Sequence, residues 1–175
     1  NKLLHGLQLQ LMIYLNAVVE SEQNRLSGMP VEPAGVFYYR LENPVLEGRD
    51  RGEIEKKLLL EQRPDGYCRG EEEILLMRDR KLLEGDLKSE VIPVEFKKDG
   101  SFSVNSKVAD GEGFRLMQRY AGWKAAELGK RMMDGETAAE PYVYGKENAC
   151  TWCSYYGVCC FDGCLPGCTA RLLYK

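Results

Sequence analysis

The chain opens with a long, almost continuously apolar run. Residues 5–20 begin HGLQLQLMIYLNAVV, in which Gln8 and Gln10 stand where a protein core would place leucine. The LQLQL alternation would suit a strand, but the length of the run favours a buried helix. A Gly- and Pro-punctuated segment follows, and residues 36–42 are then an aromatic and β-branched run of strand length. The pattern predicts a buried helix and, after a loop, a strand.

Helical and hairpin patterns fill the middle of the chain. Residues 71–85 have acids early, bases later and a closing glycine, as the helix dipole and C-terminal capping prefer. The long segment after the hairpin has apolar residues at three- and four-residue steps, typical of an amphipathic helix. The predicted elements are helices over 53–63, 71–85 and 109–136, with a β-hairpin over 90–104 that turns at Asp-Gly.

This order of elements predicts a mixed α and β (α/β) domain without internal repeats. About three strands are too few for a complete sheet, so we expect further strands upstream of Asn1. The cysteines concentrate at the C-terminal end, where the last 40 residues contain six of the seven. We therefore predict a main part over residues 1–145 and a cysteine-rich tail of the same domain over 146–175.

Composition and charge narrow the class of protein. The 175 residues are 44% hydrophobic and 29% charged, which is ordinary for one globular domain. The net charge of -3 argues against a strongly basic nucleic-acid-binding surface but permits a local basic groove. No apolar run has membrane-spanning length and no secretory signal precedes the first helix, so we expect a cytoplasmic protein. Because the chain lacks an initial Met, we expect it to be a piece of a longer protein.

The cysteine pattern indicates a metal site more strongly than a disulfide framework. An odd number of cysteines in a chain without an export signal disfavours disulfides. Cys150 and Cys153 form a CxxC turn, and Cys159 follows after five residues. Soft thiolates select zinc or an iron–sulfur cluster, and either closed site needs four ligands. The candidates for the fourth ligand are Cys160, Cys164, Cys168, Cys68 or a residue outside this chain.

Two polar side chains in the first helix also need an explanation. Gln10 and Tyr14 are four residues apart and share one helical face, whereas Gln8 points away from Gln10. A buried amide without partners costs about 1 to 3 kcal/mol, so Gln10 needs a hydrogen bond from backbone, water, Tyr14 or a ligand. For the helix alone, a core glutamine beside a core tyrosine is the simpler interpretation.

Four segments together carry a resemblance to a known family. They are HGLQLQLMIYLNAV, PAGVFYYRLENP, VIPVEFKKDGSFS and the closing PYVYGKENACTWCSYYGVCCFD. With the long helix, they closely resemble the C-terminal nuclease domain of the AddB family, subunits of the bacterial AddAB ATP-dependent helicase-nucleases. The specific motifs are QxxxY, matched by Gln10 and Tyr14, and CxxC-x5-C, matched by Cys150, Cys153 and Cys159.

The resemblance implies a RecB-type fold of the PD-(D/E)XK nuclease superfamily, which is restriction-endonuclease-like. It implies a magnesium-dependent DNA exonuclease that works with an AddA subunit in resecting double-strand ends for recombinational repair. Gln10 and Tyr14 would support catalysis. The acidic and lysine residues that hold magnesium in this family precede the matched region, so we expect this chain alone to be inactive.

The family also implies a 4Fe-4S cluster held by Cys150, Cys153 and Cys159, with a fourth cysteine upstream of this chain. Cys164 and Cys168 depart from the family pattern. They are either redundant thiols or substitutes for the fourth ligand. A cluster that pins the tail to the beginning of the domain would act as a staple of the fold.

Other residues have simpler interpretations than a role in catalysis. His5 has no nucleophile beside it and suits a cap or a solvent contact. The acids at 71–73 and Asp79 suit a solvated surface, and Cys68 suits an incidental position in a turn. The five basic residues of the long helix could follow a DNA backbone but better suit a solvated face; they are Arg115, Arg119, Lys124, Lys130 and Arg131.

Two other functional classes remain open. A Cas4-like nuclease shares the QxxxY pair and the cysteine tail, but the long interval between Tyr14 and Cys150 favours the AddB type. A non-enzymatic zinc- or cluster-binding interaction module would carry zinc without iron. The truncated sheet edge could also pair with a second copy of the chain.

Overall fold

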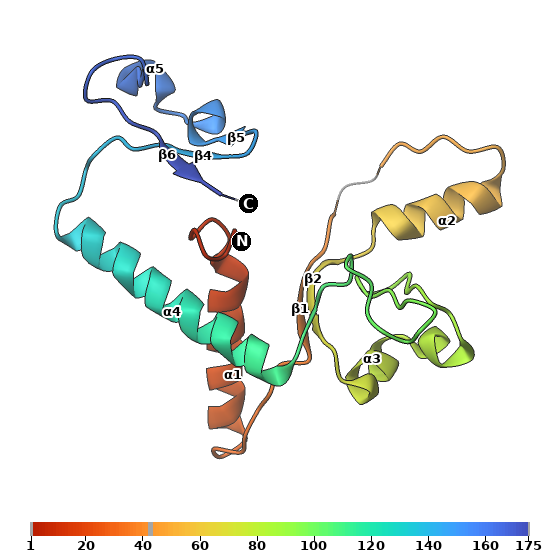
Figure 1. Cartoon of the computed structure of the whole chain (residues 1–175). Coiled ribbons are helices and arrows are strands. Elements are labelled where there is room, and N and C mark those ends of the chain that lie inside the picture. The colour runs from red at the N-terminus through yellow and green to blue at the C-terminus, as the bar shows by residue number, and fades with distance from the viewer. Residues whose placement is uncertain (1, 42–43, 175) are drawn as a thin grey trace. The chain divides into compact units, whose positions relative to one another are not determined.

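The computed structural model describes residues 2–41 and 44–174 and divides the chain into two compact units (Figure 1). The first unit combines Asn1–Leu9 with Tyr120–Lys175, and the second is Gln10–Arg119. The boundary at residues 119 and 120 falls within one long helix, α4, which covers Gly111–Met133. Within the described residues, no helix is both long and apolar enough to cross a membrane.

The second unit is built around a three-stranded sheet in the order β1-β2-β3. β1 and β2 are antiparallel, with Val36 opposite Tyr67, and β2 and β3 are parallel. A Cβ on Gly66 would lie 2.1 Å from the Val36 carbonyl oxygen, so the pairing of β1 and β2 requires glycine there. The elements are α1 (Gln10–Arg25), β1 (Gly35–Tyr38), α2 (Arg51–Glu61), β2 (Asp65–Arg69), α3 (Glu72–Arg78), η1 (Arg80–Glu84) and β3 (Val108–Ala109), before the start of α4.

A compact apolar cluster forms the core of this unit. Cys68, Leu75, Ile92 and Val94 are all buried in it. Partly buried side chains pack around them: Phe37, Ile74, Leu82, Phe96, Phe102 and Val108. The core therefore joins β2, α3 and the irregular segment between η1 and β3.

The first unit has its own small sheet, in the order β5-β4-β6. After α4 come β4 (Tyr142–Tyr144), β5 (Glu147–Asn148), η2 (Ala149–Trp152), α5 (Tyr156–Cys159) and β6 (Arg171–Leu173). β4 pairs in parallel with β6, so the segment between them forms a loop that is closed at its base. All six C-terminal cysteines lie in this loop.

The N-terminal segment is held in the first unit by contacts with sequence-distant residues. Lys2 pairs with Glu147 at 2.6 Å, and the Tyr120 hydroxyl donates to the Leu4 carbonyl at 2.6 Å. Nε2 of His5 lies 2.9 Å from the Tyr174 carbonyl oxygen, and the His5 ring packs edge-on against Tyr144. His5 thus makes structural contacts with strand β4 and the residue after β6.

Several predicted elements are confirmed. α2 and α4 match the predicted helices within a few residues. β1 confirms only the first part of the strand predicted over 36–42, because it ends at Tyr38 and residues 39–41 are not in a strand. Residue 42, at the end of that predicted strand, lies outside the described residues. Asp50 caps α2 by accepting from the Glu53 amide at 2.8 Å, and Asp110 caps α4 by accepting from the Gly113 amide at 2.7 Å.

The prediction of a buried helix over residues 5–20 is wrong in two respects. Residues 2–6 form turns, with Gly6 at a φ of +78°, and α1 begins only at Gln10. Within α1 only Met12 is buried, while Ile13, Tyr14 and Val18 are exposed. An apolar run becomes a core helix only where other elements cover it on every side, which the sequence of the helix itself does not specify.

Two further predictions need correction. The helix predicted over 71–85 is divided into α3 and η1 at Asp79, whose backbone is extended and whose side chain accepts from the Lys81 amide at 3.1 Å. The strands predicted over 90–104 are replaced by an isolated bridge between Phe96 and Phe102, and Glu95 bridges to Lys88 before the predicted hairpin. Its Asp-Gly turn is present, with Gly100 at a φ of +80°.

Candidate functional site

Gln10 and Tyr14 lie together on an exposed face of α1. The Gln10 amide donates a hydrogen bond to the Tyr14 hydroxyl oxygen at 2.9 Å, as the four-residue helical spacing allows. The Tyr14 side chain is 59% exposed, and Gln10 is exposed as well. The pair is therefore a surface pair, and the interpretation as a core glutamine beside a core tyrosine is wrong.

The hydrogen bond leaves unused donors on both side chains. A glutamine amide has two N–H donors, of which Tyr14 takes one, and the tyrosine keeps its own O–H donor. These two donors, from neighbouring atoms on one helical face, can both reach acceptors of an anionic ligand such as a phosphate. Gln8 is exposed too, but it precedes the helix and has no such partner among the described residues.

The three cysteines of the CxxC-x5-C motif lie on short turns of the closed loop between β4 and β6. Asn148 caps η2 by accepting from the Cys150 amide at 2.8 Å, and Cys153 ends that turn. Cys159 is the last residue of α5. Cys150 is half-buried, Cys153 and Cys159 are exposed, and all three are free thiols.

The thiols of these cysteines suit a site for a soft metal, but the structure does not bring the three thiols together. Free thiols within ten residues can supply the thiolates that zinc or an iron–sulfur cluster requires. Among the residues that the structure describes, however, no three Cys, His, Asp or Glu side chains converge so that they could hold a metal ion. The structure therefore assigns no ligand geometry to Cys150, Cys153 and Cys159.

The additional C-terminal cysteines are free thiols as well. Cys160 has a left-handed backbone with a φ of +47°, and its thiol lies 3.4 Å from the Gly157 carbonyl oxygen. The Cys164 amide donates to the Asp162 side chain at 2.9 Å, which holds the turn that follows. Cys168 precedes β6.

Cys68 is a core residue. It is completely buried within β2, and its thiol donates to the Ala34 carbonyl oxygen at 3.6 Å. Burial raises the pKa of the Cys68 thiol, which disfavours the thiolate that a metal would need. The expectation that Cys68 lies in a turn is wrong, and as a fourth ligand it would have to leave the core of its unit.

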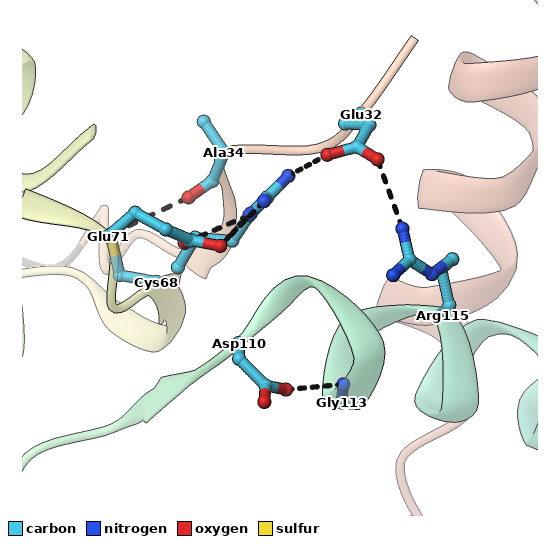
Figure 2. Close-up of polar contacts among 8 residues, drawn as sticks. Glu32, Ala34, Cys68, Glu71, Asp110, Gly113 and Arg115 are labelled. Carbon is cyan, nitrogen blue, oxygen red and sulfur yellow. Dashed lines mark hydrogen bonds and ion pairs between the residues drawn. The ribbon is translucent and has the colours of Figure 1, made fainter. Parts of the chain in front are cut away.

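A chain of ion pairs that the sequence does not reveal joins four segments of the second unit. Arg69 donates three hydrogen bonds to Glu71, from Nη2 to Oε1 at 2.6 Å and from Nε to Oε2 at 3.0 Å and to Oε1 at 3.1 Å. Arg69 also pairs with Glu32, and Arg115 reaches the other oxygen of Glu32 at 3.0 Å (Figure 2). The side chain of Arg69 is only 13% exposed, and it packs so close to Gly111 that a Cβ there would lie 2.9 Å from its Nη2.

The ion pairs shift the pKa values of their members in opposite directions. Hydrogen bonds from Arg69 hold the pKa of Glu71 and that of Glu32 below the ordinary value of 4.5. Those two carboxylates, Glu71 first, raise the pKa of Arg69. The network thus keeps alternating charges fixed between the segment before β1, the end of β2 and the starts of α3 and α4.

Other charged residues singled out by the sequence also have defined contacts. Arg131 and Lys124 pair with Glu127, and Arg131 pairs with Glu136 as well, so much of the charge on this side of α4 is neutralised. Asp79, which we assigned to the surface, is instead buried and accepts from the Ser89 hydroxyl at 2.6 Å. It is buried because it lies at the break between α3 and η1, whose backbone it caps.

The chain matches a known protein family and several curated proteins. The profile of the PD-(D/E)XK nuclease superfamily matches residues 1–160. The B subunit of the ATP-dependent helicase/deoxyribonuclease of Bacillus cereus (strain B4264) is 35% identical over 162 residues, as is that of Bacillus anthracis, and that of Bacillus mycoides (strain KBAB4) is 34% identical. Each alignment covers 90% of this chain and 14% of the relative, so the chain spans about one seventh of the length of these proteins.

Proposed function

Because the chain belongs to the PD-(D/E)XK nuclease superfamily, we propose that it is the C-terminal part of the B subunit of an ATP-dependent helicase/deoxyribonuclease. The complete enzyme would hydrolyse phosphodiester bonds of DNA while it resects double-strand ends for recombinational repair. The observation that supports this best is the exposed, hydrogen-bonded pair of Gln10 and Tyr14 within the matched region. Its partners would be DNA and the AddA subunit of the same complex, in the cytoplasm.

The proposed role of Gln10 and Tyr14 is to orient the DNA phosphate next to the reacting bond. Their unused N–H and O–H donors can bind phosphate oxygens, and their mutual hydrogen bond fixes the direction of both. Magnesium does not fit these two side chains, because it prefers carboxylate oxygens. We propose that magnesium is held by residues of the complete subunit outside this chain, and that the chain alone does not cut DNA.

Replacing Gln10 with alanine in the complete subunit tests this role. Loss of one positioning hydrogen-bond donor should lower the rate of DNA cleavage about three- to tenfold while the fold is retained. The measurement is the initial rate of nucleotide release at saturating DNA. Gln8→Ala is the matched control, since Gln8 is also exposed but lies outside α1. Equal rates for the two variants would remove Gln10 from the site.

We also propose that Cys150, Cys153 and Cys159 hold a 4Fe-4S cluster together with a cysteine outside this chain. The support is their chemistry and position: they are free thiols in a loop whose base is closed by the pairing of β4 with β6. A cluster would supply a covalent staple across this loop, and its ligands would draw the turns of η2 and α5 together. The cysteines of the chain would position the tail and take no part in phosphodiester hydrolysis.

The cluster proposal predicts different results for two cysteines of the same loop. Cys153→Ser in the complete subunit should abolish the visible absorbance of the cluster, because one of the four thiolates is lost. Cys164→Ser should retain that absorbance, since Cys164 is outside the motif. Iron analysis of anaerobically prepared protein accompanies the spectra. Zinc without iron would instead support the interaction module, and an unchanged spectrum of the Cys153 variant would exclude it as a ligand.

The alternative function is that of a Cas4-like nuclease, which has the same two motifs. The interval between Tyr14 and Cys150 contains α2, α3 and η1, and residues of α3 and η1 pack in the core cluster of the second unit. This insertion and the match over 90% of the chain both favour the AddB type.

A further inference from the structure

The second unit contains a cavity that the proposed function does not use. It has a volume of about 480 Å³, within the usual range for sites that bind small organic ligands. Its lining comes from Gly70, α3, Leu82 and the segments 85–87 and 96–102. The apolar residues of its lining are Leu75, Leu76, Leu82, Leu87, Phe96 and Phe102.

The walls of this cavity are fixed by the core. Phe96 and Phe102 stack on each other with ring centroids 5.0 Å apart, and both pack against the buried cluster around Leu75. Gly85 and Gly100 are at positive φ and also line the cavity, and a Cβ on either would meet no atom within 4 Å. The cavity therefore lies beside the stacked rings of Phe96 and Phe102, and the two glycines leave space in it.

Four charged side chains add polarity to this apolar lining. Lys97 and Lys98 come from the turn between Phe96 and Gly100, whereas Glu72 comes from α3 and Asp86 from the segment after η1. Within the described part of the chain, none of these four side chains has an ion-pair or hydrogen-bond partner. A ligand that satisfies them needs an anionic group, hydrogen-bond donors and an apolar surface.

We propose that this cavity binds one nucleotide unit of single-stranded DNA. A base offers a flat apolar face to Phe96 and Phe102, and its phosphate can bind Lys97 and Lys98. The exocyclic amino group of cytosine, adenine or guanine can donate to a carboxylate, whereas thymine has no such group. An apolar peptide side chain would contact the leucines but leave the four charges unmatched. The inference rests on the proposed function, because DNA is the substrate proposed there.

Titration of the full 175-residue chain with short oligonucleotides tests the proposal. Binding of dC and dT hexanucleotides is followed by ¹⁵N NMR in EDTA, so that no cleavage takes place. The oligo-dC should shift the amides of residues 85–87 and 96–102, and it should bind about threefold more tightly than oligo-dT. Leu76→Trp, which fills the cavity without a change of charge, should weaken binding of oligo-dC about tenfold.

A matched pair of double variants separates the cavity from general electrostatics. Lys97→Glu with Lys98→Glu should weaken binding of oligo-dC at least about tenfold. Lys56→Glu with Lys57→Glu makes the same change of charge on α2, outside the cavity, and should stay within about twofold of the wild type. Equal losses of oligo-dC affinity in the two double variants would overturn the proposal. NMR shifts confined to amides outside residues 85–87 and 96–102 would also overturn it, as would shifts of these amides with a leucine-rich acidic peptide but not with oligo-dC.

The outcome is independent of the test of the proposed function. If the complete subunit does not cut DNA but oligo-dC binds here, the nuclease proposal fails and the binding site stands. If the complete subunit cuts DNA and the cavity variants bind as the wild type does, only this inference fails.

Discussion

Ile92→Ala is expected to lower the free energy of unfolding of the second unit by about 3 kcal/mol. The Ile92 side chain is only 3% exposed and belongs to the buried cluster of Cys68, Leu75 and Val94. Truncation removes three carbon atoms from a packed core and leaves a void that the surrounding segments can fill only in part. Its amide also binds the Ser89 hydroxyl at 3.0 Å, so the backbone cannot shift freely into that void.

The neighbouring residue provides the control for this prediction. Val91 is 50% exposed, and Val91→Ala should change the free energy of unfolding by less than about 0.5 kcal/mol. Because the chain has two units, hydrogen exchange of the β2 and α3 amides under increasing urea measures the relevant stability better than a global melting temperature. Equal destabilisation by the two substitutions would mean that the cluster is not the core of this unit.

The elements that depend on local pattern could be predicted from the sequence. α4 has a long three- and four-residue apolar repeat, and α2 has an N-cap aspartate, so both are specified within their own residues. β3 and β5 have only two residues each and exist through pairing with distant strands. The sequence does not predict β2, because Gly66 suggests a turn, whereas in the structure the close approach of β1 requires glycine there.

The candidate site was predictable in a similar, partial way. The hydrogen bond between Gln10 and Tyr14 follows from helical spacing, but the exposure of the pair depends on which elements cover α1. The cysteine spacing identifies candidate ligands, while their convergence depends on the conformation of the turns and stays a prediction. The ion pair of Arg69 with Glu32 connects residues that are 37 positions apart in the sequence, and no local signal marks it.

The network around Arg69 is the feature whose loss should show most clearly as a change in pH dependence. Glu71 and Glu32 have lowered pKa values in the folded chain because Arg69 binds their ionised forms. The ionised carboxylates therefore stabilise the folded chain. This stabilisation is fully present above pH 4.5, which is the ordinary pKa of a glutamate. It is lost as the pH falls through the lowered pKa values, since the acids are then protonated in both states.

Arg69→Met should accordingly lower the free energy of unfolding by about 2 kcal/mol at pH 7. The difference from the wild type should shrink as the pH falls below 4.5, the ordinary pKa of these carboxyl groups. Methionine keeps an unbranched apolar stem but cannot bind the carboxylates, and Glu71 and Glu32 are partly exposed, so water limits the loss. Arg51→Met is the matched control, because the pair of Arg51 with Glu55 is exposed and local. Urea titrations at pH 7 and at several pH values below 4.5 measure the free energy of unfolding. If this free energy changed with pH in the same way for Arg69→Met and the wild type, the network would not hold the four segments together.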